Sequence, residues 1–321
     1  MKISRSFKTR LILILVLLMI VPLVIFGIIT INQEKSLIEN NIYSQNMNLA
    51  EGLEREIDVI VTNAEITVKS LAETREIKEM KPQEISEIIN TITNGNPYIA
   101  NLYIMNRSGM QIYKTIGDLD DRSDRDYFKI AIKGETNFSN VLISGSREVP
   151  IVVYASPIIN NGRVVGVIGA SIELDVLSEI AADYKPGETG YGFIVENLGR
   201  VIAHPDETLT GDMADLSHLK PVNDVINGAA GVSEYTYQGE NKLAAYVPVD
   251  KTGWGVVVQL TTEEAFESLF DGVREAVIII VITIVIGILA AYFIGLYITS
   301  PILKAANFAQ QIAKGDLQVK E

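Results

Sequence analysis

One stretch of the sequence combines charges and aromatic rings at a spacing that could do chemistry. Residues 121–134, DRSDRDYFKIAIKG, alternate acids with bases and then reach Tyr127 and Phe128. Three interpretations are open: a cluster of catalytic acids, a surface loop held by ion pairs, or a grip for a small polar ligand. Arg125 favours the grip, because its guanidinium stays charged and offers a planar fork of donors that fits a carboxylate.

The surface-loop interpretation also stays open on these residues alone. Arg125 has three acids close to it in sequence, Asp121, Asp124 and Asp126. Exposed ion pairs of this kind contribute only about 0–1 kcal/mol to stability. In the ligand interpretation, Tyr127 and Phe128 would instead supply the apolar walls that are usual in small-molecule pockets.

The residue pattern gives little support to catalysis, metal binding or nucleic-acid binding. The acids lie among turn-forming residues with no nucleophile motif. His204 and His218 lack close metal-ligand spacing, and the HPD sequence that begins at His204 is expected to form a turn. The chain has no cysteine and a net charge of −13, which argues against thiol chemistry and phosphate binding. We therefore expect no enzyme activity, no metal and no cofactor.

Two apolar segments lie on either side of the region that contains these residues. Residues 11–31 and 276–298 carry no charge, and each reaches the roughly 20 residues that a helix needs to cross a bilayer. A cleaved signal peptide is the alternative for the first segment, although no small-residue cleavage site follows it. Lysines and arginines before residue 11 predict a cytoplasmic amino terminus, which leaves residues 32–275 outside.

A long amphipathic helix is predicted directly after the first apolar segment, from about residue 34 to residue 75. Its apolar residues recur at spacings of three and four and form one stripe: Leu53, Ile57, Ile60, Val61, Ala64, Val68 and Leu71. An ordinary core helix is rarely so long. We therefore expect a stalk whose apolar stripe is buried against a second copy of the chain, as a homodimer.

The region between residues 98 and 261 reads as two copies of one module. NLYIMNRSGMQI, residues 101–112, aligns with YGFIVENLGRVI, residues 191–202, and each half reads as strand, glycine turn and strand. Further downstream, Gly166 and Gly255 lie in similar apolar strands. Several matches in the same order predict two related α+β lobes. Trp254 is expected to pack in the core at the start of a strand.

Together these features resemble the double Cache sensor of bacterial chemoreceptors, the methyl-accepting chemotaxis proteins, and of sensor kinases. The resemblance rests on the order of span, stalk and two lobes, on SDRDYF, on YASPI followed by GRVVGVIGASIEL, and on GETGYGFIVENLGRVIAHPD. Residues 299–321 resemble the first helix of a HAMP linker, beginning at Pro301 and ending at the glycine of AKGDL. The resemblance thus implies a chain that stops within that linker.

The resemblance implies an α+β fold in which a long stalk helix precedes two PAS-like lobes and two transmembrane helices flank the whole. The expected segments are a cytoplasmic terminus, 1–10; a first span, 11–31; a stalk, about 34–75; a membrane-distal lobe, about 76–180; a membrane-proximal lobe, about 181–265; a second span, 276–298; and a linker, 299–321.

In this family the distal lobe usually binds the ligand. A subset that recognises amino acids uses an arginine followed, at the second and third positions, by two aromatics, which Arg125, Tyr127 and Phe128 match. The subset's other tyrosines and acids correspond here to Asp120, Leu142, Ser144 and Ser171, so the acids that hold a ligand ammonium are missing. We expect a carboxylate or another polar metabolite, bound by Arg125, Tyr127, Phe128, Ser144, Tyr154 and Ser171.

The resemblance implies a receptor in the bacterial inner membrane, in contact with lipid, that signals to cytoplasmic partners for chemotaxis. The alternative is a sensor histidine kinase or a cyclic-dinucleotide enzyme with the same sensor.

Overall fold

A computed structural model describes residues 2–93, 96–145 and 149–313 of the chain. It divides into two compact units, one formed by residues 42–265 and the other by the segments on either side of them. By its place in the sequence, Ser146 could add a neutral donor beside Ser144, and Gly315 is the glycine of AKGDL. Both residues lie outside the described residues.

The flanking unit consists of the first part of helix α1 (Lys2–Ala72) and helix α9 (Glu267–Ala313). Within the described residues, these two helices are long and apolar enough to cross a membrane. Leu18, Phe26 and Ile279 are among their exposed apolar side chains, as expected for surfaces that face lipid rather than water. Gly27 allows close packing, since a Cβ there would lie 2.6 Å from Ile280 Cδ1.

Two helix boundaries differ from the sequence-based expectation. A separate helix was expected to begin at Pro301, but α9 continues through Pro301 to Ala313. A proline removes only one backbone hydrogen bond, and a long helix can retain its neighbours on both sides. The sequence LTTEEAFESLFDGVREA, residues 260–276, predicts one helix that continues directly into the second span, whereas the structure divides it at Phe266 into α8 (Thr262–Ala265) and α9.

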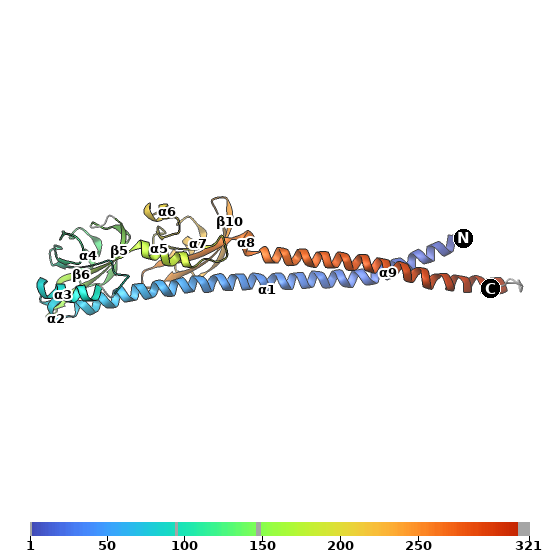
Figure 1. Cartoon of the computed structure of the whole chain (residues 1–321), viewed down its shortest axis with the longest axis horizontal. Helices are drawn as coiled ribbons and strands as arrows, with labels where there is room; N and C mark the ends of the chain where they lie inside the picture. The colour runs from blue at the N-terminus through green and yellow to red at the C-terminus, as the bar shows by residue number, and fades with distance from the viewer. Residues whose placement is uncertain (1, 94–95, 146–148, 314–321) are drawn as a thin grey trace. The chain divides into compact units, whose positions relative to one another are not determined.

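The predicted stalk helix is present, but its apolar stripe is buried within its own chain. Figure 1 shows the second half of α1 running beside both sheets of the unit formed by residues 42–265. Leu53, Ile57 and Ile60 pack in one core cluster, and Val68 and Leu71 pack in another. The stripe therefore offers no apolar seam to a second copy. That argument for a homodimer is wrong, and the homodimer itself stays a prediction.

The distal lobe holds a six-stranded antiparallel sheet in the order β2-β1-β6-β5-β3, with β4 also paired to β5. Its strands are β1 (Asn101–Asn106), β2 (Gln111–Lys114), β3 (Asn137–Phe138), β4 (Leu142–Ile143), β5 (Pro150–Asn160) and β6 (Arg163–Glu173). Its helices are α2 (Arg75–Lys78), α3 (Pro82–Thr93) and α4 (Asp126–Ala131).

The proximal lobe holds a five-stranded antiparallel sheet in the order β8-β7-β11-β10-β9. Its strands are β7 (Tyr191–Val195), β8 (Val201–Ala203), β9 (Gly231–Tyr237), β10 (Glu240–Val249) and β11 (Trp254–Thr261). Its helices are α5 (Leu174–Asp183), α6 (Glu207–Gly211) and α7 (Lys220–Ile226).

The two sheets have equivalent strand orders, so the predicted internal repeat is confirmed. β1, β2, β6, β5 and β3 occupy the places of β7, β8, β11, β10 and β9. The proposed match of Gly166 with Gly255 is out of register by one residue, because Gly166 pairs with Asn106 whereas Gly255 pairs with Val195. Each glycine meets a local need: a Cβ would collide with Met105 O at the first and with Val225 at the second.

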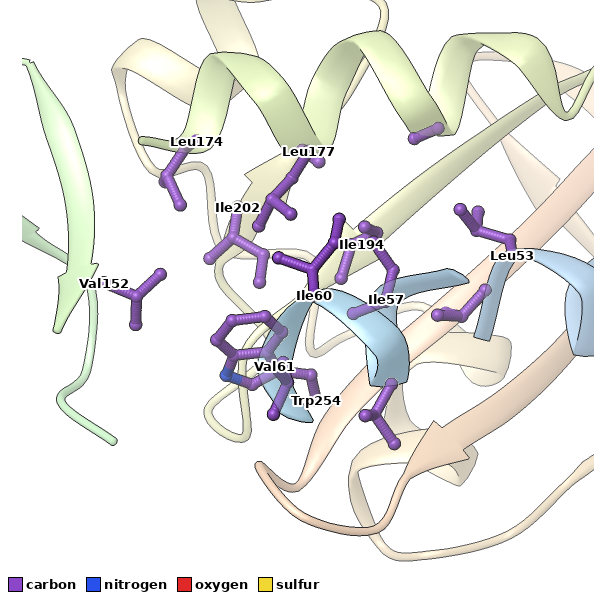
Figure 2. Close-up of a cluster of buried hydrophobic side chains, with 14 of the residues drawn as sticks. Leu53, Ile57, Ile60, Val61, Val152, Leu174, Leu177, Ile194, Ile202 and Trp254 are labelled. Atoms are coloured by element: carbon purple, nitrogen blue, oxygen red, sulfur yellow. The ribbon is translucent and has the colours of Figure 1, made fainter. Parts of the chain in front are cut away.

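Each sheet packs against other elements on both of its faces. Successive residues of a strand point to opposite faces, so neighbours in one strand lie in different core clusters. In the distal lobe, Ile104 and Tyr154 face the stalk, whereas Tyr103 and Val153 face α4. A central cluster joins the stalk to both lobes and contains Trp254, which is 3% exposed (Figure 2). The expectation that Trp254 packs in the core is confirmed.

Candidate functional site

The stretch that begins at Asp121 forms a tight turn and then helix α4. Asp121 Oδ1 accepts a hydrogen bond from Ser123 N at 2.9 Å, and Arg122 N donates to Gly109 O at 2.9 Å. Gly109 has φ +93°, and a Cβ there would lie 2.5 Å from Ser123 Cα. These contacts fix the backbone that carries both arginines into α4.

The proximal lobe builds the same turn from equivalent residues. Asp215 Oδ1 accepts from Ser217 N at 2.9 Å, and Leu216 N donates to Gly199 O at 2.9 Å. Gly199 has φ +81°, and a Cβ there would lie 2.7 Å from Ser217 Cβ. Because the Asp-x-Ser turn recurs where no DRSDR sequence exists, its aspartate and serine are structural residues of the repeat. The turn therefore accounts for Asp121 and Ser123.

The two arginines are what distinguish the distal turn from the proximal one. Arg122 corresponds to Leu216, and Arg125, the residue before α4, corresponds to Leu219, the residue before α7. Both leucines are buried in the proximal core. The turn and its helix therefore form with apolar residues at these positions, so the arginines are not required by the fold.

The arginines line a cleft on the α4 side of the distal sheet. Four of the six residues expected to bind ligand lie there together: Arg125, Tyr127, Ser144 and Ser171. The cleft is also lined by residues that sequence reasoning did not assign to it: Asn101, Tyr103, Gln111, Lys114, Arg122, Ile143, Gly145 and Ile151. Leu142 completes the lining; it corresponds to one of the tyrosines and acids that the amino-acid-binding subset of the family carries. The cavity has a volume of about 30 Å³, which is room for roughly one or two waters.

Phe128 and Tyr154 are not brought to this cleft. Phe128 packs beneath α4 in the core between that helix and the sheet. Tyr154 points to the opposite face, where its ring lies 4.7 Å from the ring of Phe138 and packs in the cluster that contains Val68. The sequence could not assign the face of Tyr154, because β5 is buried on both faces and its residues do not alternate between apolar and polar.

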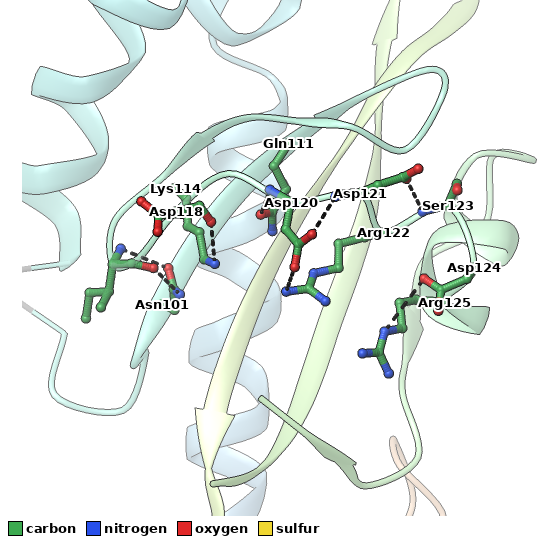
Figure 3. Close-up of polar contacts among 11 residues, drawn as sticks. Asn101, Gln111, Lys114, Asp118, Asp120, Asp121, Arg122, Ser123, Asp124 and Arg125 are labelled. Atoms are coloured by element: carbon green, nitrogen blue, oxygen red, sulfur yellow. Dashed lines mark hydrogen bonds and ion pairs between the residues drawn. The ribbon is translucent and has the colours of Figure 1, made fainter. Parts of the chain in front are cut away.

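The two guanidinium groups differ in their partners (Figure 3). Arg122 Nη2 lies 2.8 Å from Asp120 Oδ2, and the Arg122 side chain is only 12% exposed. Arg125 Nε lies 3.8 Å from Asp124 Oδ1, beyond hydrogen-bonding distance, and its side chain is 34% exposed. The expected cluster around Arg125 thus reduces to one loose pair, since Asp126 pairs with Lys129 at 3.2 Å.

A third cation, Lys114, lies on the same wall. Its Nζ donates to Asp118 O at 2.9 Å. Burial lowers the pKa of the Lys114 ammonium, and the neighbouring positive charge of Arg122 lowers it further. The described lining residues thus carry three positive charges and no carboxylate, so the electrostatic potential of the cleft favours an anion.

Neutral polar groups complete the lining, and most already have partners. Ser171 Oγ donates to Asn101 O at 3.3 Å, and Gln111 Oε1 accepts from Asp120 N at 3.0 Å. Burial, and secondarily the Tyr127 phenol, raise the pKa of the Tyr103 phenol well above its usual value. Tyr103 therefore stays neutral and keeps its proton.

A strap, residues 139–145, closes one side of the cleft and connects it to the other lobe. Its Ser139 pairs with the backbone of Val153 on β5. Its Val141 N–H donates to Oε2 of Glu196 at 3.1 Å, and Glu196 lies at the end of β7 in the proximal lobe. Glu196 is 1% exposed and also pairs with Arg200. Its repeat counterpart, Asn106, instead caps its own turn at Ser108 and Met110.

His204 has the surroundings of a core histidine. Its ring lies 5.0 Å from the ring of Tyr191, and its Nδ1 accepts a hydrogen bond from Asp206 N at 2.8 Å, which closes the predicted turn. Burial lowers the pKa of the imidazole to about 4. Among the described residues no group of three metal-ligating side chains includes it.

A signal in the sequence could have identified Arg122. Aligning the two copies through Gly134 and Gly228, the glycines that follow α4 and α7, places Arg122 opposite Leu216, a charged residue in place of an apolar one. Lys114 and Gln111 carry no comparable signal, because polar residues at the end of a short strand are common on any surface.

Known proteins share both the sequence pattern and the fold. Residues 34–269 match the sequence family described as Cache domain. The methyl-accepting chemotaxis protein TlpA of Bacillus subtilis is 24% identical over 97% of this chain and 47% of its own length, so the chain spans about half the length of that relative.

Among solved structures, the extracellular domain assigned to a histidine kinase, rpHK1S-Z16, superposes with a TM-score of 0.62 and 18% identity, covering 70% of this chain and 95% of that one. The ligand-binding domain of Mlp24 with asparagine superposes with a TM-score of 0.59 and 17% identity, covering 73% and 98%. At these identities the structures establish the fold alone. By its sequence match over most of its length, the chain belongs to the Cache domain family.

Proposed function

We propose that the chain is the sensor and membrane-anchoring part of a bacterial chemoreceptor, and that the distal cleft binds a small anionic metabolite through Arg125. The two apolar helices anchor the sensor in the cell membrane, with residues 32–275 on the outer side. The chemotaxis assignment is supported by the relatives, which are methyl-accepting chemotaxis proteins.

The observation that carries the ligand proposal is the exchange of arginine for leucine between two copies of one turn. Leu216 and Leu219 show that the repeat folds with apolar residues at these positions. A charged residue in their place costs desolvation unless it gains a partner. For Arg125 the nearest carboxylate in the described chain, Asp124, is 3.8 Å away. A ligand carboxylate supplies the missing bidentate partner.

The proposed ligand differs from those named for the solved relatives. Mlp24 was solved with asparagine and PctB with L-Arg, and both ligands carry an α-ammonium group. The described lining of this cleft contains no carboxylate to receive an ammonium. A carboxylate ligand without an α-amine is the better match.

Signalling requires that the ligand bind one of two conformations more tightly than the other. With a cavity of about 30 Å³, the cleft must widen to admit a metabolite. The strap is the element to move, because Leu142, Ile143 and Ser144 line the cleft. Its Val141 is bonded to Glu196, so movement of the strap acts directly on the proximal lobe.

The test is calorimetric titration of the full chain in lipid nanodiscs against small carboxylates. Arg125→Leu, which installs the residue of the proximal copy, is expected to weaken binding by roughly tenfold or more through loss of a charge-assisted pair. Arg107→Leu, in an exposed turn, is the matched control. Unchanged affinity in Arg125→Leu would show that Arg125 does not hold the ligand.

A sensor kinase is a second candidate, because the kinase-assigned domain superposes as closely as the chemoreceptor domain does. The sensor is the same in both cases, and the output domain distinguishes them. Reading the gene beyond the codon for Glu321 tests this directly: a histidine-kinase core there would contradict the chemotaxis assignment.

A further inference from the structure

We propose that the distal cleft is built for a ligand with two separate anionic ends, such as a short dicarboxylate, with Arg125 holding one end and Arg122 with Lys114 the other. This rests on the proposed function, that the cleft is the ligand site, and it specifies the ligand class.

Charge is the first observation. Lys114, Arg122 and Arg125 all line the cleft, whereas the acids that approach them lie outside the lining. Asp120, the partner of Arg122, is 54% exposed at the rim, and Asp124 is further from Arg125 than a hydrogen bond allows. One ligand carboxylate would satisfy the fork of Arg125 and leave Arg122 and Lys114 with the exposed Asp120 as the nearest carboxylate. A second ligand carboxylate would supply the further negative charge that these two cations can bind.

The placement of Arg122 is the second observation. Its guanidinium lies against the strap at Gly145, where a Cβ would be 2.5 Å from Nη2. The absent side chain at Gly145 leaves the space that the guanidinium occupies, so Arg122 is seated in the cleft wall rather than extended into solvent. The corresponding residue of the proximal lobe, Leu216, faces the core.

The Lys114 ammonium is partly buried in the same cleft wall and lies near enough to Arg122 to interact with its charge. Burial and then the charge of Arg122 depress its pKa, although Asp118 and Asp120 act in the opposite direction. A second ligand carboxylate beside Lys114 and Arg122 would reverse the depression. The dianion would thus be bound by cations that are paired incompletely in its absence.

The lining also disfavours an ammonium at either end of the ligand. The described lining has no negative charge to offset that of an ammonium. Its amide oxygens also have partners in the protein, since Asn101 Oδ1 accepts from Thr115 Oγ1 at 2.7 Å and Gln111 Oε1 accepts from Asp120 N. Replacing a ligand carboxylate by an ammonium would therefore exchange attraction for repulsion without a compensating carboxylate in the described lining.

Three four-carbon compounds test the proposal on the full chain in nanodiscs: succinate, with two carboxylates; butyrate, with one; and 4-aminobutyrate, with an ammonium in place of the second. Succinate is expected to bind most tightly, at least roughly tenfold better than butyrate. Arg122→Leu and Lys114→Met should weaken succinate binding and leave butyrate binding nearly unchanged. Asp120→Asn, which removes the protein's own partner of Arg122, should keep or strengthen succinate binding.

Several outcomes would overturn the two-ended site. One is equal affinity for butyrate and succinate, and another is tighter binding of 4-aminobutyrate than of both. A third is equal weakening of succinate and butyrate by Arg122→Leu, which would make Arg122 a support for the strap. Tighter binding of methyl phosphate than of succinate would indicate a site for one compact anion. If Arg125→Leu weakens butyrate binding but Arg122→Leu leaves succinate binding unchanged, the two-ended site is wrong and the proposed function stands. If no anion depends on Arg125, the proposed function fails with it.

Discussion

Glu196 provides the most demanding test of how the two lobes are connected. Its buried carboxylate accepts from Val141 N–H at 3.1 Å and pairs with Arg200. Glu196→Ala removes the acceptor and leaves the backbone donor of the strap without a partner at a position where Val141 is 8% exposed. Glu196→Gln keeps an acceptor oxygen and removes only the charge, so it separates the hydrogen bond from the ion pair.

The magnitude follows from these contacts. A buried N–H that loses its acceptor costs about 1–3 kcal/mol, a factor of roughly 5–150 in an equilibrium. The Arg200 side chain is 32% exposed, so its ion pair adds only about 0–1 kcal/mol. We therefore expect Glu196→Ala to destabilise the strap by about 1–4 kcal/mol and Glu196→Gln to destabilise it by about 0–1 kcal/mol.

Hydrogen–deuterium exchange of the full chain in nanodiscs measures this locally. In Glu196→Ala the amide of Val141 should exchange roughly 5–700 times faster, the factor that corresponds to about 1–4 kcal/mol, whereas Glu196→Gln should resemble the wild type. Glu135→Ala, at an exposed position in the turn after α4, is the matched control. Unchanged exchange at Val141 in Glu196→Ala, or equal effects of alanine and glutamine, would refute the reasoning.

Three further predictions concern stability. Gly109→Ala should lower the free energy of unfolding by about 1–3 kcal/mol, because the new Cβ meets Ser123 in a left-handed backbone; equal thermal midpoints of variant and wild type would contradict this. Trp254→Ala should lower the free energy of unfolding by about 3–5 kcal/mol through the cavity left beside the stalk. Urea denaturation should show a lower midpoint for this variant, whereas alanine in place of an exposed aromatic residue should leave the midpoint unchanged. His204 has a pKa near 4 in the folded chain, below its ordinary 6.5, so the unfolded chain takes up the proton first as the pH falls. The stability that comes from the neutral His204 is present above pH 6.5, and up to roughly 3 kcal/mol of it is lost as the pH falls from 6.5 to 4. His204→Phe should remove this part of the acid sensitivity in urea titrations. If the variant and the wild type lost stability equally over this pH range, the assignment to His204 would be wrong.

The sequence by itself determined the features that depend on composition and local period. Residues 11–31 and 276–298 are uncharged and apolar over the length that a membrane-spanning helix needs, and a stripe at spacings of three and four predicts a helix. The order of strands and glycine turns predicts that one module occurs twice, and aligning Gly134 with Gly228 further along the module places Arg122 opposite Leu216.

The tertiary structure decided what those patterns could not specify. Periodicity says that one face of the stalk is buried, but the same stripe suits a second copy or the chain's own sheets, and the sheets cover it. A strand buried on both faces has no alternation to read, so only the assembled sheet sends Val153 toward the cleft side and Tyr154 toward the stalk. The cleft itself gathers Lys114, Arg122 and Ser171 from separate segments, because side chains distant in sequence meet only when the strands pair.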